Sequence, residues 1–179
     1  FTPVWAEAQD DLYTRSLQPS AEWNLPADGP KALESKRVIF VAATLRNSGI
    51  LGVAEGLVEA SKAIGWEVDV LDARGSDDAI KQLLDEAVLS PPDGLVLGGF
   101  DAKKYGEQLN ALSKAGTSIV GWHAGPLSGA IDEASVFFNV TTDPLEVAKV
   151  AALHAIETGG DELGVVIFTD ERFEIALAK

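Results

Sequence analysis

The segment IVGWHAGP, residues 119–126, places an indole and an imidazole side by side after a run of apolar residues. The imidazole of His123 can transfer protons or form hydrogen bonds, and the indole of Trp122 offers a flat apolar surface. Other hydrogen-bonding and aromatic residues follow other apolar runs. They are Arg46, Asn47, Asp101, Asn139, Arg172 and Phe173. A pocket for a small hydroxyl-rich molecule needs such groups, so we predict that these eight residues bind a ligand.

Each of these residues also suits a plainer role. Arg46 suits a solvated loop charge, Asn47 a turn or a helix cap, and Asp101 an N-cap before AKKYGEQLNAL. Trp122 suits the end of a core strand, and His123 suits a surface loop. Their joint occurrence after apolar runs favours the binding role over these separate ones.

No catalytic, metal-binding or nucleotide-binding motif accompanies the candidate residues. The loop TLRNSG, after the first apolar run, lacks the glycines of both phosphate-binding fingerprints. No serine lies in a G-x-S-x-G motif, and no two carboxylates have an obvious catalytic spacing. The chain has no cysteine and two histidines, His123 and His154, which are too few for a histidine-based zinc site. We interpret His154 as structural and predict a binding protein, not an enzyme, without metal or cofactor.

Charge and hydropathy exclude further classes of protein. The chain has 28 acidic and 14 basic residues, and its net charge of −14 repels nucleic acid and anionic membrane surfaces. No apolar run reaches the roughly 18 residues that a membrane-spanning helix needs. In the opening FTPVWAEAQDD, the triplets 4–6 and 6–8 have the small-residue spacing that signal peptidases read. This spacing favours an exported protein, and an ordinary flexible N-terminus is the alternative.

The candidate residues must be positioned by elements of regular structure. From Arg37 onward, apolar runs rich in β-branched residues alternate with helical patterns. The apolar runs predict strands at 37–44, 67–72, 94–98, 118–122, 136–140 and 163–168. Apolar residues at helical spacing predict helices over about 50–64 and 80–87. The sequence Thr142-Asp143-Pro144 predicts the start of another helix, which runs to about Thr158.

Strands that alternate with helices and are apolar on both faces indicate a parallel sheet covered on each side. We therefore predict a doubly wound α/β fold, in which ligands bind outside the carboxyl ends of the strands. All the candidate residues lie at such ends. The chain divides into an N-terminal extension (1–36), a first α/β lobe (37–140) and the start of a second, incomplete lobe (141–179).

The segment VIFVAATLRNSGILGVAEGLVEASKAIGWEVDVLDA resembles the opening of type I periplasmic sugar-binding proteins, the ribose- and galactose-binding type. In that family a first strand leads to a T-L-x-N loop, a helix with a central glycine, and a second strand that ends in D-A. The similarity continues through DDAIKQLLDEAVLSPPDGLVLGGFDAKKYGEQLNALSKAGTSIVGW. It spans residues 37–179 in pattern and order.

The resemblance implies a periplasmic receptor, monomeric and without cofactor, that captures a small solute between two lobes. It delivers the solute to the inner-membrane permease of an ABC importer, and its lobes close by hinge bending. The first lobe runs to about Asn139, and Lys179 is not the expected end of a complete receptor. The resemblance places Asn47 on a ligand-contact position, Asp101 on the loop aspartate, and Asn139 near the asparagine at the lobe crossover.

The chain departs from the family pattern at two places. It has Gly49 and Ile50 where sugar receptors often carry two aromatic side chains, and His123 and Ala124 where they often carry an Asp-Arg pair. The arginine that would make paired hydrogen bonds to sugar hydroxyls is therefore missing there. We hypothesise that Arg46 replaces its charge and Trp122 the stacking surface. A sugar or sugar-like ligand is the expectation, and a different small polar or partly aromatic solute is the alternative.

Two other functions are compatible with this fold. The first is the effector-binding domain of a lactose-repressor-like regulator, which a basic helix-turn-helix should precede. Residues 1–36 hold few basic residues and four prolines, and this disfavours a regulator. The second is a doubly wound hydrolase or isomerase, in which substitution of a candidate residue would abolish turnover.

Overall fold

The computed structural model describes residues 12–19, 29–159 and 163–166. Two of the predicted ligand-binding residues, Arg172 and Phe173, lie outside these ranges. Within the part described, residues 12–16 are helical, and the α/β fold begins at Arg37.

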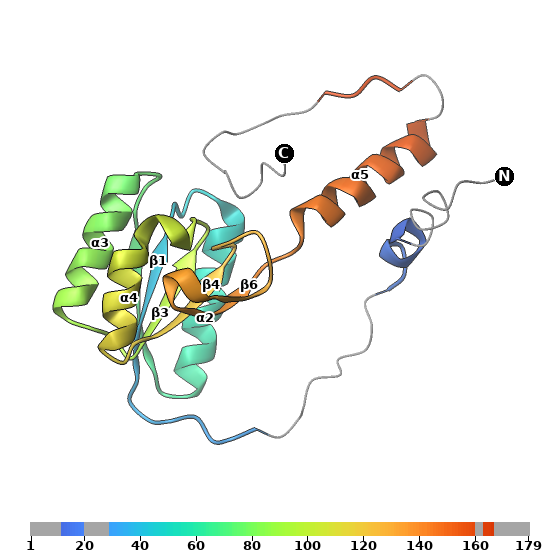
Figure 1. Cartoon of the computed structure of the whole chain (residues 1–179). Coiled ribbons are helices and arrows are strands. Elements are labelled where there is room, and N and C mark those ends of the chain that lie inside the picture. The colour runs from blue at the N-terminus through green and yellow to red at the C-terminus, as the bar shows by residue number, and fades with distance from the viewer. Residues whose placement is uncertain (1–11, 20–28, 160–162, 167–179) are drawn as a thin grey trace.

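A six-stranded sheet forms the centre of the fold (Figure 1). Its strands are β1 (Arg37–Ala42), β2 (Glu67–Asp72), β3 (Gly94–Gly98), β4 (Ser118–Trp122), β5 (Gly129–Ile131) and β6 (Val136–Val140). They lie in the order β2-β1-β3-β4-β6-β5. Neighbouring strands are parallel except for β5 and β6, which pair antiparallel. The predicted doubly wound α/β fold is thus confirmed. The first strand ends two residues earlier than predicted, and β5 was not predicted because three residues are too few to show an alternating pattern.

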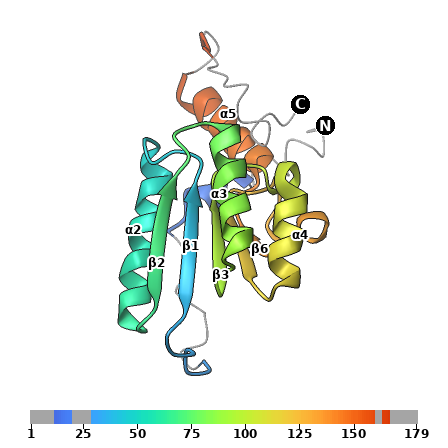
Figure 2. The same cartoon turned by 90° about the vertical axis from the view of Figure 1, so that its left-hand side faces the viewer.

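Helices cover the two faces of the sheet unequally. The helices are α2 (Ser48–Ala63), α3 (Asp77–Leu89), α4 (Gly106–Lys114) and α5 (Pro144–Gly159), and two 3₁₀ turns are η1 (Ala102–Tyr105) and η2 (Asp132–Ala134). Helices α3 and α4 lie on one face and α2 on the other (Figures 1 and 2). The first three α-helices confirm the alternation of strand and helix read from the sequence, and α5 begins and ends close to its predicted bounds.

Side-chain polarity explains where these helices begin. Asn47 accepts hydrogen bonds from the backbone N–H groups of Gly49 and Ile50, which have no partner within the first turn of α2. Ser76 accepts one from the N–H of Ala79 and caps α3 in the same way. Asp143 accepts from the N–H groups of Leu145 and Glu146, as the Asp-Pro pair predicts for α5.

The core lies mainly between the sheet and helices α3 and α4. Ile39, Val41, Leu95, Leu97 and Ile119 point from the strands toward Leu84 and Leu109 of these helices, and all are buried. On the opposite face Phe40 and Ala42 pack against Ile50 and Ala54 of α2.

The α2 face is not fully covered in the part of the chain that the structure describes. On β6, Phe138 is 45% exposed and Val140 is 52% exposed. They pair in register with Val120 and Trp122, so they share the α2 face of the sheet. The expectation of a sheet covered on both sides therefore holds for the α3–α4 face but not for this part of the other face.

The strand predicted at 163–168 is wrong for residues 163–166, which have no regular secondary structure. Residues 167 and 168 lie outside the described residues. A strand requires a neighbouring strand to satisfy its backbone hydrogen bonds, and residues 163–166 pair with none of the described strands. An apolar β-branched run alone does not supply that partner.

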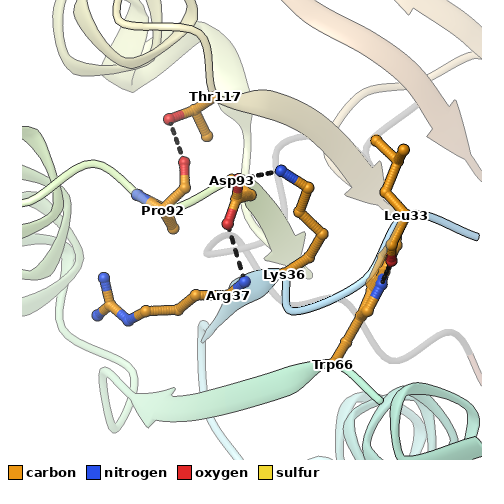
Figure 3. Close-up of polar contacts among 7 residues, drawn as sticks. All are labelled: Leu33, Lys36, Arg37, Trp66, Pro92, Asp93 and Thr117. Atoms are coloured by element: carbon orange, nitrogen blue, oxygen red, sulfur yellow. Dashed lines mark hydrogen bonds and ion pairs between the residues drawn. The ribbon is translucent and has the colours of Figure 1, made fainter. Parts of the chain in front are cut away.

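Polar contacts hold together the loops at the amino ends of the strands (Figure 3). The carboxylate of Asp93 accepts hydrogen bonds from the backbone N–H of Arg37 (2.9 Å) and from Nζ of Lys36 (2.7 Å). These two contacts, the backbone N–H first, lower the pKa of Asp93 below its ordinary value. Nearby, Trp66 Nε1 donates to the carbonyl of Leu33 (2.6 Å). The loops at the carboxyl ends remain available for a site.

Candidate functional site

A cavity of about 460 Å³ lies at the carboxyl ends of the strands, between the loops that follow β1, β3, β4 and β6 and the first turns of α5. Its lining residues are Asn47, Ile50, Gly99, Trp122, His123, Thr141, Thr142, Pro144, Val147, Ala148 and Ala151. This is where a doubly wound sheet is expected to bind a small ligand.

The indole of Trp122 extends from the end of β4 toward the start of α2. Its Cη2 atom would lie 3.3 Å from a Cβ atom at Gly49, and its Cζ3 atom 3.9 Å from one at Gly99. The absence of a side chain at Gly49 gives the indole room, whereas a Cβ atom at Gly99 would be in ordinary van der Waals contact with it. Trp122 thus forms an aromatic wall on the side of the cavity where the chain has Gly49.

His123 is fixed in an uncommon backbone conformation beside Trp122. Its φ is 51°, in the left-handed region, and its backbone N–H donates to the carbonyl of Val140 (3.0 Å). The imidazole makes an edge-to-face contact with the indole, with 4.4 Å between ring centroids and an interplanar angle of 84°. Its Nδ1 atom lies 2.8 Å from the hydroxyl oxygen of Thr141. Burial lowers the pKa of His123, so the ring is neutral at pH 7.

Asn139 is fully buried and organises the loop that follows β4. Its Oδ1 atom accepts a hydrogen bond from the backbone N–H of Ala124 (2.9 Å). Its Nδ2 atom donates to the carbonyls of Gly125 (3.1 Å) and Leu127 (2.8 Å). Both amide protons are therefore used within the protein. Asn139 does not line the cavity, and its geometry is that of a residue that positions the loop carrying His123.

Asn47 combines two roles at the start of α2. Its Oδ1 atom caps the helix, as described above, and the residue lines the cavity. Among the described residues its Nδ2 group makes no hydrogen bond, so two N–H donors remain for a ligand.

Arg46 and Asp101 lie outside the cavity. Asp101 accepts a hydrogen bond from the backbone N–H of Lys103 (2.9 Å) and so caps η1. Arg46 is exposed, and within the described ranges it forms no ion pair. The cavity thus brings together Asn47, Trp122 and His123 from the predicted set, and it does not include Arg46, Asp101 or Asn139.

The wall contributed by α5 was not predicted as part of the site. Pro144, Val147, Ala148 and Ala151 line the cavity at the spacing i, i+3, i+4, i+7 of one helix face. This stripe is visible in the sequence. The helix also carries apolar residues on its other faces, such as Leu145 and Ile156, so the pattern alone does not say which stripe faces a ligand.

A second cavity, of about 500 Å³, lies at the amino ends of the strands beside α2. Three of its polar side chains are already paired, because Lys36 Nζ donates to Asp93 and Trp66 Nε1 donates to the carbonyl of Leu33 (Figure 3). It therefore offers a ligand fewer free hydrogen-bonding groups than the first cavity. In the part of the chain that the structure describes, no three acidic, histidine or cysteine side chains gather as a metal site would require, and no helix is long and apolar enough to cross a membrane.

Three solved structures share the fold of this chain. An ABC transporter solute-binding protein from Agrobacterium vitis with bound allitol has a TM-score of 0.58 and 21% identity, over 70% of this chain and 41% of its own. LsrB from Clostridium saccharobutylicum in complex with AI-2 has a TM-score of 0.55 and 20% identity, over 70% of this chain and 39% of its own.

The third is an ABC transporter periplasmic solute-binding protein from Actinobacillus succinogenes with bound D-allose. It has a TM-score of 0.55 and 19% identity, over 71% of this chain and 46% of its own. The chain thus spans less than half the length of each of these proteins. No curated protein matches the sequence.

The family of the chain follows from its sequence. The family model described as a periplasmic binding protein domain matches residues 38–173, which is most of the chain. The resemblance to type I periplasmic binding proteins is confirmed by this match and by the shared fold. The chain belongs to the periplasmic binding protein domain family.

Proposed function

We propose that this protein is the solute-binding receptor of an ABC importer, that it acts in the periplasm, and that it captures a sugar or sugar-like molecule. One observation carries the proposal. The cavity gathers an aromatic wall, a neutral imidazole and an amide at the carboxyl ends of the strands, in a chain of the periplasmic binding protein family. Aromatic faces and neutral hydrogen-bonding groups together bind small hydroxyl-bearing molecules.

The cavity lies between two parts of the chain that a short segment joins. Residues 141–143 connect β6 to α5, and the cavity has walls on both sides of this connection. We propose that a ligand in contact with both walls favours the closed arrangement, because it makes more contacts there than in an open one. The division into lobes at about residues 140 and 141 is part of this proposal.

The contact between Thr141 and His123 resembles, in distance, the pairing of a nucleophile with its base. A working pair also needs a third group that orients the histidine, and none of the described carboxylates makes a hydrogen bond to His123. The pair therefore supports a binding role better than acyl transfer. The proposal is of a receptor without catalytic activity.

Thermal unfolding of the full-length protein with and without candidate ligands tests the proposal. D-allose, allitol, pentoses, other hexoses and charged sugar acids form the panel. A ligand of the native state at a hundredfold excess over its Kd adds about 2.7 kcal/mol to the free energy of unfolding. The Trp122→Ala variant should lose the ligand-induced rise in Tm, and the matched Trp66→Phe variant should keep it. If no member of the panel raises Tm, the sugar receptor is the wrong function.

A further inference from the structure

The lining of the cavity specifies a class of ligand more narrowly than the proposed function does, and the inference rests on that function. We infer that the site selects an uncharged molecule with one hydrocarbon face that donates a hydroxyl group to Nε2 of His123. A 6-deoxyhexose is a sugar of this class, because its methyl group replaces a hydroxymethyl group.

The first argument is the charge of the cavity wall. In the part of the chain that the structure describes, no residue that lines the cavity is charged at neutral pH. Among the described residues, the charged ones nearest in sequence to the lining residues are Arg46 before α2, Asp101 after β3, and Asp143, Glu146 and Lys149 at the start of α5, and none of them lines the cavity. A charged ligand would lose its hydration without gaining an ion pair from these residues, and this weakens its binding. The wall therefore selects for a neutral molecule.

The second argument is the apolar share of the wall. Six of the eleven lining residues carry an apolar side chain or one whose only polar atom is an indole nitrogen, and they are Ile50, Trp122, Pro144, Val147, Ala148 and Ala151. A ring hydroxyl placed against the aliphatic part of this surface would lose its water and find no partner there, which weakens binding. A methyl group or a C–H face in the same place would gain contact with the indole and the helix. The wall thus favours a partly deoxygenated ligand.

The third argument concerns the proton on His123. The hydroxyl oxygen of Thr141 lies 2.8 Å from Nδ1 of His123 and 3.2 Å from the carbonyl oxygen of Thr142. A hydroxyl has one proton, and a carbonyl oxygen can only accept. Both contacts are hydrogen bonds only if Thr141 donates to the carbonyl and Nδ1 of His123 donates to Thr141. This arrangement assigns the proton to Nδ1 and leaves Nε2 as an acceptor.

Nε2 of His123 has no partner among the described residues, and the ring lines the cavity. A ligand hydroxyl can therefore donate to it. In this assignment Thr141 is a positioning residue, because it acts on the ligand through the tautomer of His123. Protonation of the ring would convert Nε2 into a donor and remove the acceptor.

Isothermal titration of the full-length protein with matched sugar pairs tests the ligand class. Each 6-deoxyhexose is compared with its parent hexose, such as L-fucose with L-galactose and L-rhamnose with L-mannose, and galacturonate provides the charged comparison. D-allose and allitol are included as fully hydroxylated neutral compounds. We expect the Kd of a 6-deoxyhexose to be lower than that of its parent hexose by a factor of about ten or more. One group in an apolar pocket gives a discrimination of this size between two ligands.

The outcomes separate the inference from the proposed function. If a parent hexose, D-allose, allitol or galacturonate binds most tightly, the inferred class is wrong and the sugar receptor stands. If no compound binds, the proposed function fails and the inference fails with it.

Variants of Thr141 test the hydrogen bond to Nε2. Thr141→Val keeps the shape but removes the hydroxyl, and we expect about tenfold weaker binding. Thr141→Ser restores the hydroxyl and should restore affinity to within about twofold of the wild type. Nitrogen NMR of the imidazole reads the tautomer directly, and a proton on Nε2 in the wild type would overturn the assignment. The affinity of the wild type should also fall as the pH falls through the pKa of His123, which burial lowers below its ordinary value, and an affinity that stays constant while nitrogen NMR shows the ring becoming protonated would contradict the acceptor role.

Discussion

The Cη2 atom of Trp122 lies 3.3 Å from the point that a Cβ atom at Gly49 would occupy. The two residues come from different elements, the end of β4 and the first turn of α2. The indole therefore fills space that a larger residue at position 49 would take. A large side chain at position 49 and the indole of Trp122 are therefore alternatives for one volume.

Gly49→Ala should have an effect on stability that depends on Trp122. A Cβ atom there would also lie 3.1 Å from Oδ1 of Asn47, so the tight space offsets the gain of about 0.5–1 kcal/mol that alanine brings to a helix. In the Trp122→Phe background the smaller ring relieves the contact with position 49, and Gly49→Ala should then raise the free energy of unfolding. Urea unfolding of the four proteins measures the coupling, which we expect to be about 0.5 kcal/mol or more.

Gly56→Ala is the matched control in the same helix, because a Cβ atom there meets nothing within 4 Å. It should stabilise both backgrounds equally. A Gly49→Ala variant that behaves like Gly56→Ala in both backgrounds would show that the indole does not occupy this space.

Asn139→Ala should destabilise the protein by about 2–4 kcal/mol, because it leaves the buried N–H of Ala124 and the carbonyl of Gly125 without their partner. Chemical denaturation measures the loss. Ser128→Ala is the control, since it removes only a peripheral hydrogen bond to the carbonyl of Asn139 and should cost about 1 kcal/mol or less. Equal losses in the two variants would contradict the positioning role of Asn139.

Protonation of His123 should weaken the fold in mildly acidic solution. Burial holds its pKa in the folded state below the unfolded value of about 6.5, so the unfolded chain binds the proton more readily. The contribution of His123 to stability is present above about pH 6.5 and is lost as the pH falls through the folded pKa. Unfolding free energies measured from pH 8 to pH 5 should show this loss. His123→Gln should remove the step, and His154→Gln should retain it.

Asp93→Asn should lower Tm at pH 7 because it removes the ion pair with Lys36. The amide oxygen can still accept from the N–H of Arg37, so the loop should keep its shape. The pKa of Asp93 is lowered in the folded state, so its contribution is present above the unfolded pKa of about 3.9 and is lost at lower pH.

Melting curves of Asp93→Asn and the wild type should therefore converge as the pH falls through this range. Asp69→Asn, which removes an exposed ion pair with Arg37, is the control and should change Tm less at pH 7. If the difference in Tm between Asp93→Asn and the wild type persists in acid, the ion pair is not the cause of the stabilisation.

The parallel strands could be predicted because each is a short apolar run bounded by turns, and the bounds of β2, β3, β4 and β6 agree with the prediction. The antiparallel strand β5 could not, since its pairing with β6 depends on the path of the preceding loop. At residues 163–166 a strand was predicted where the structure has none. They have the composition of a strand, but pairing depends on a neighbour that local sequence does not specify.

For the site, sequence reasoning located the right edge of the sheet but did not separate contact residues from positioning residues. Asn47 and Asp101 both cap helices, and only the three-dimensional arrangement shows that Asn47 also lines the cavity. Asn139 is polar and lies at a strand end, as a ligand contact would, yet its amide is used by backbone groups up to 15 residues away in sequence. Contacts between residues this far apart in sequence cannot be predicted from the spacing of neighbouring residues.

The edge-to-face contact of Trp122 with His123 also gives the protein an optical reporter. Indole emission responds to the charge and polarity around the ring, and this indole touches both the titrating imidazole and the cavity. Ligand entry and protonation of His123 should therefore change the emission of Trp122 without any attached dye. With the other three tryptophans replaced by phenylalanine, a single spectrum would follow the occupancy of the site and the charge state of its histidine.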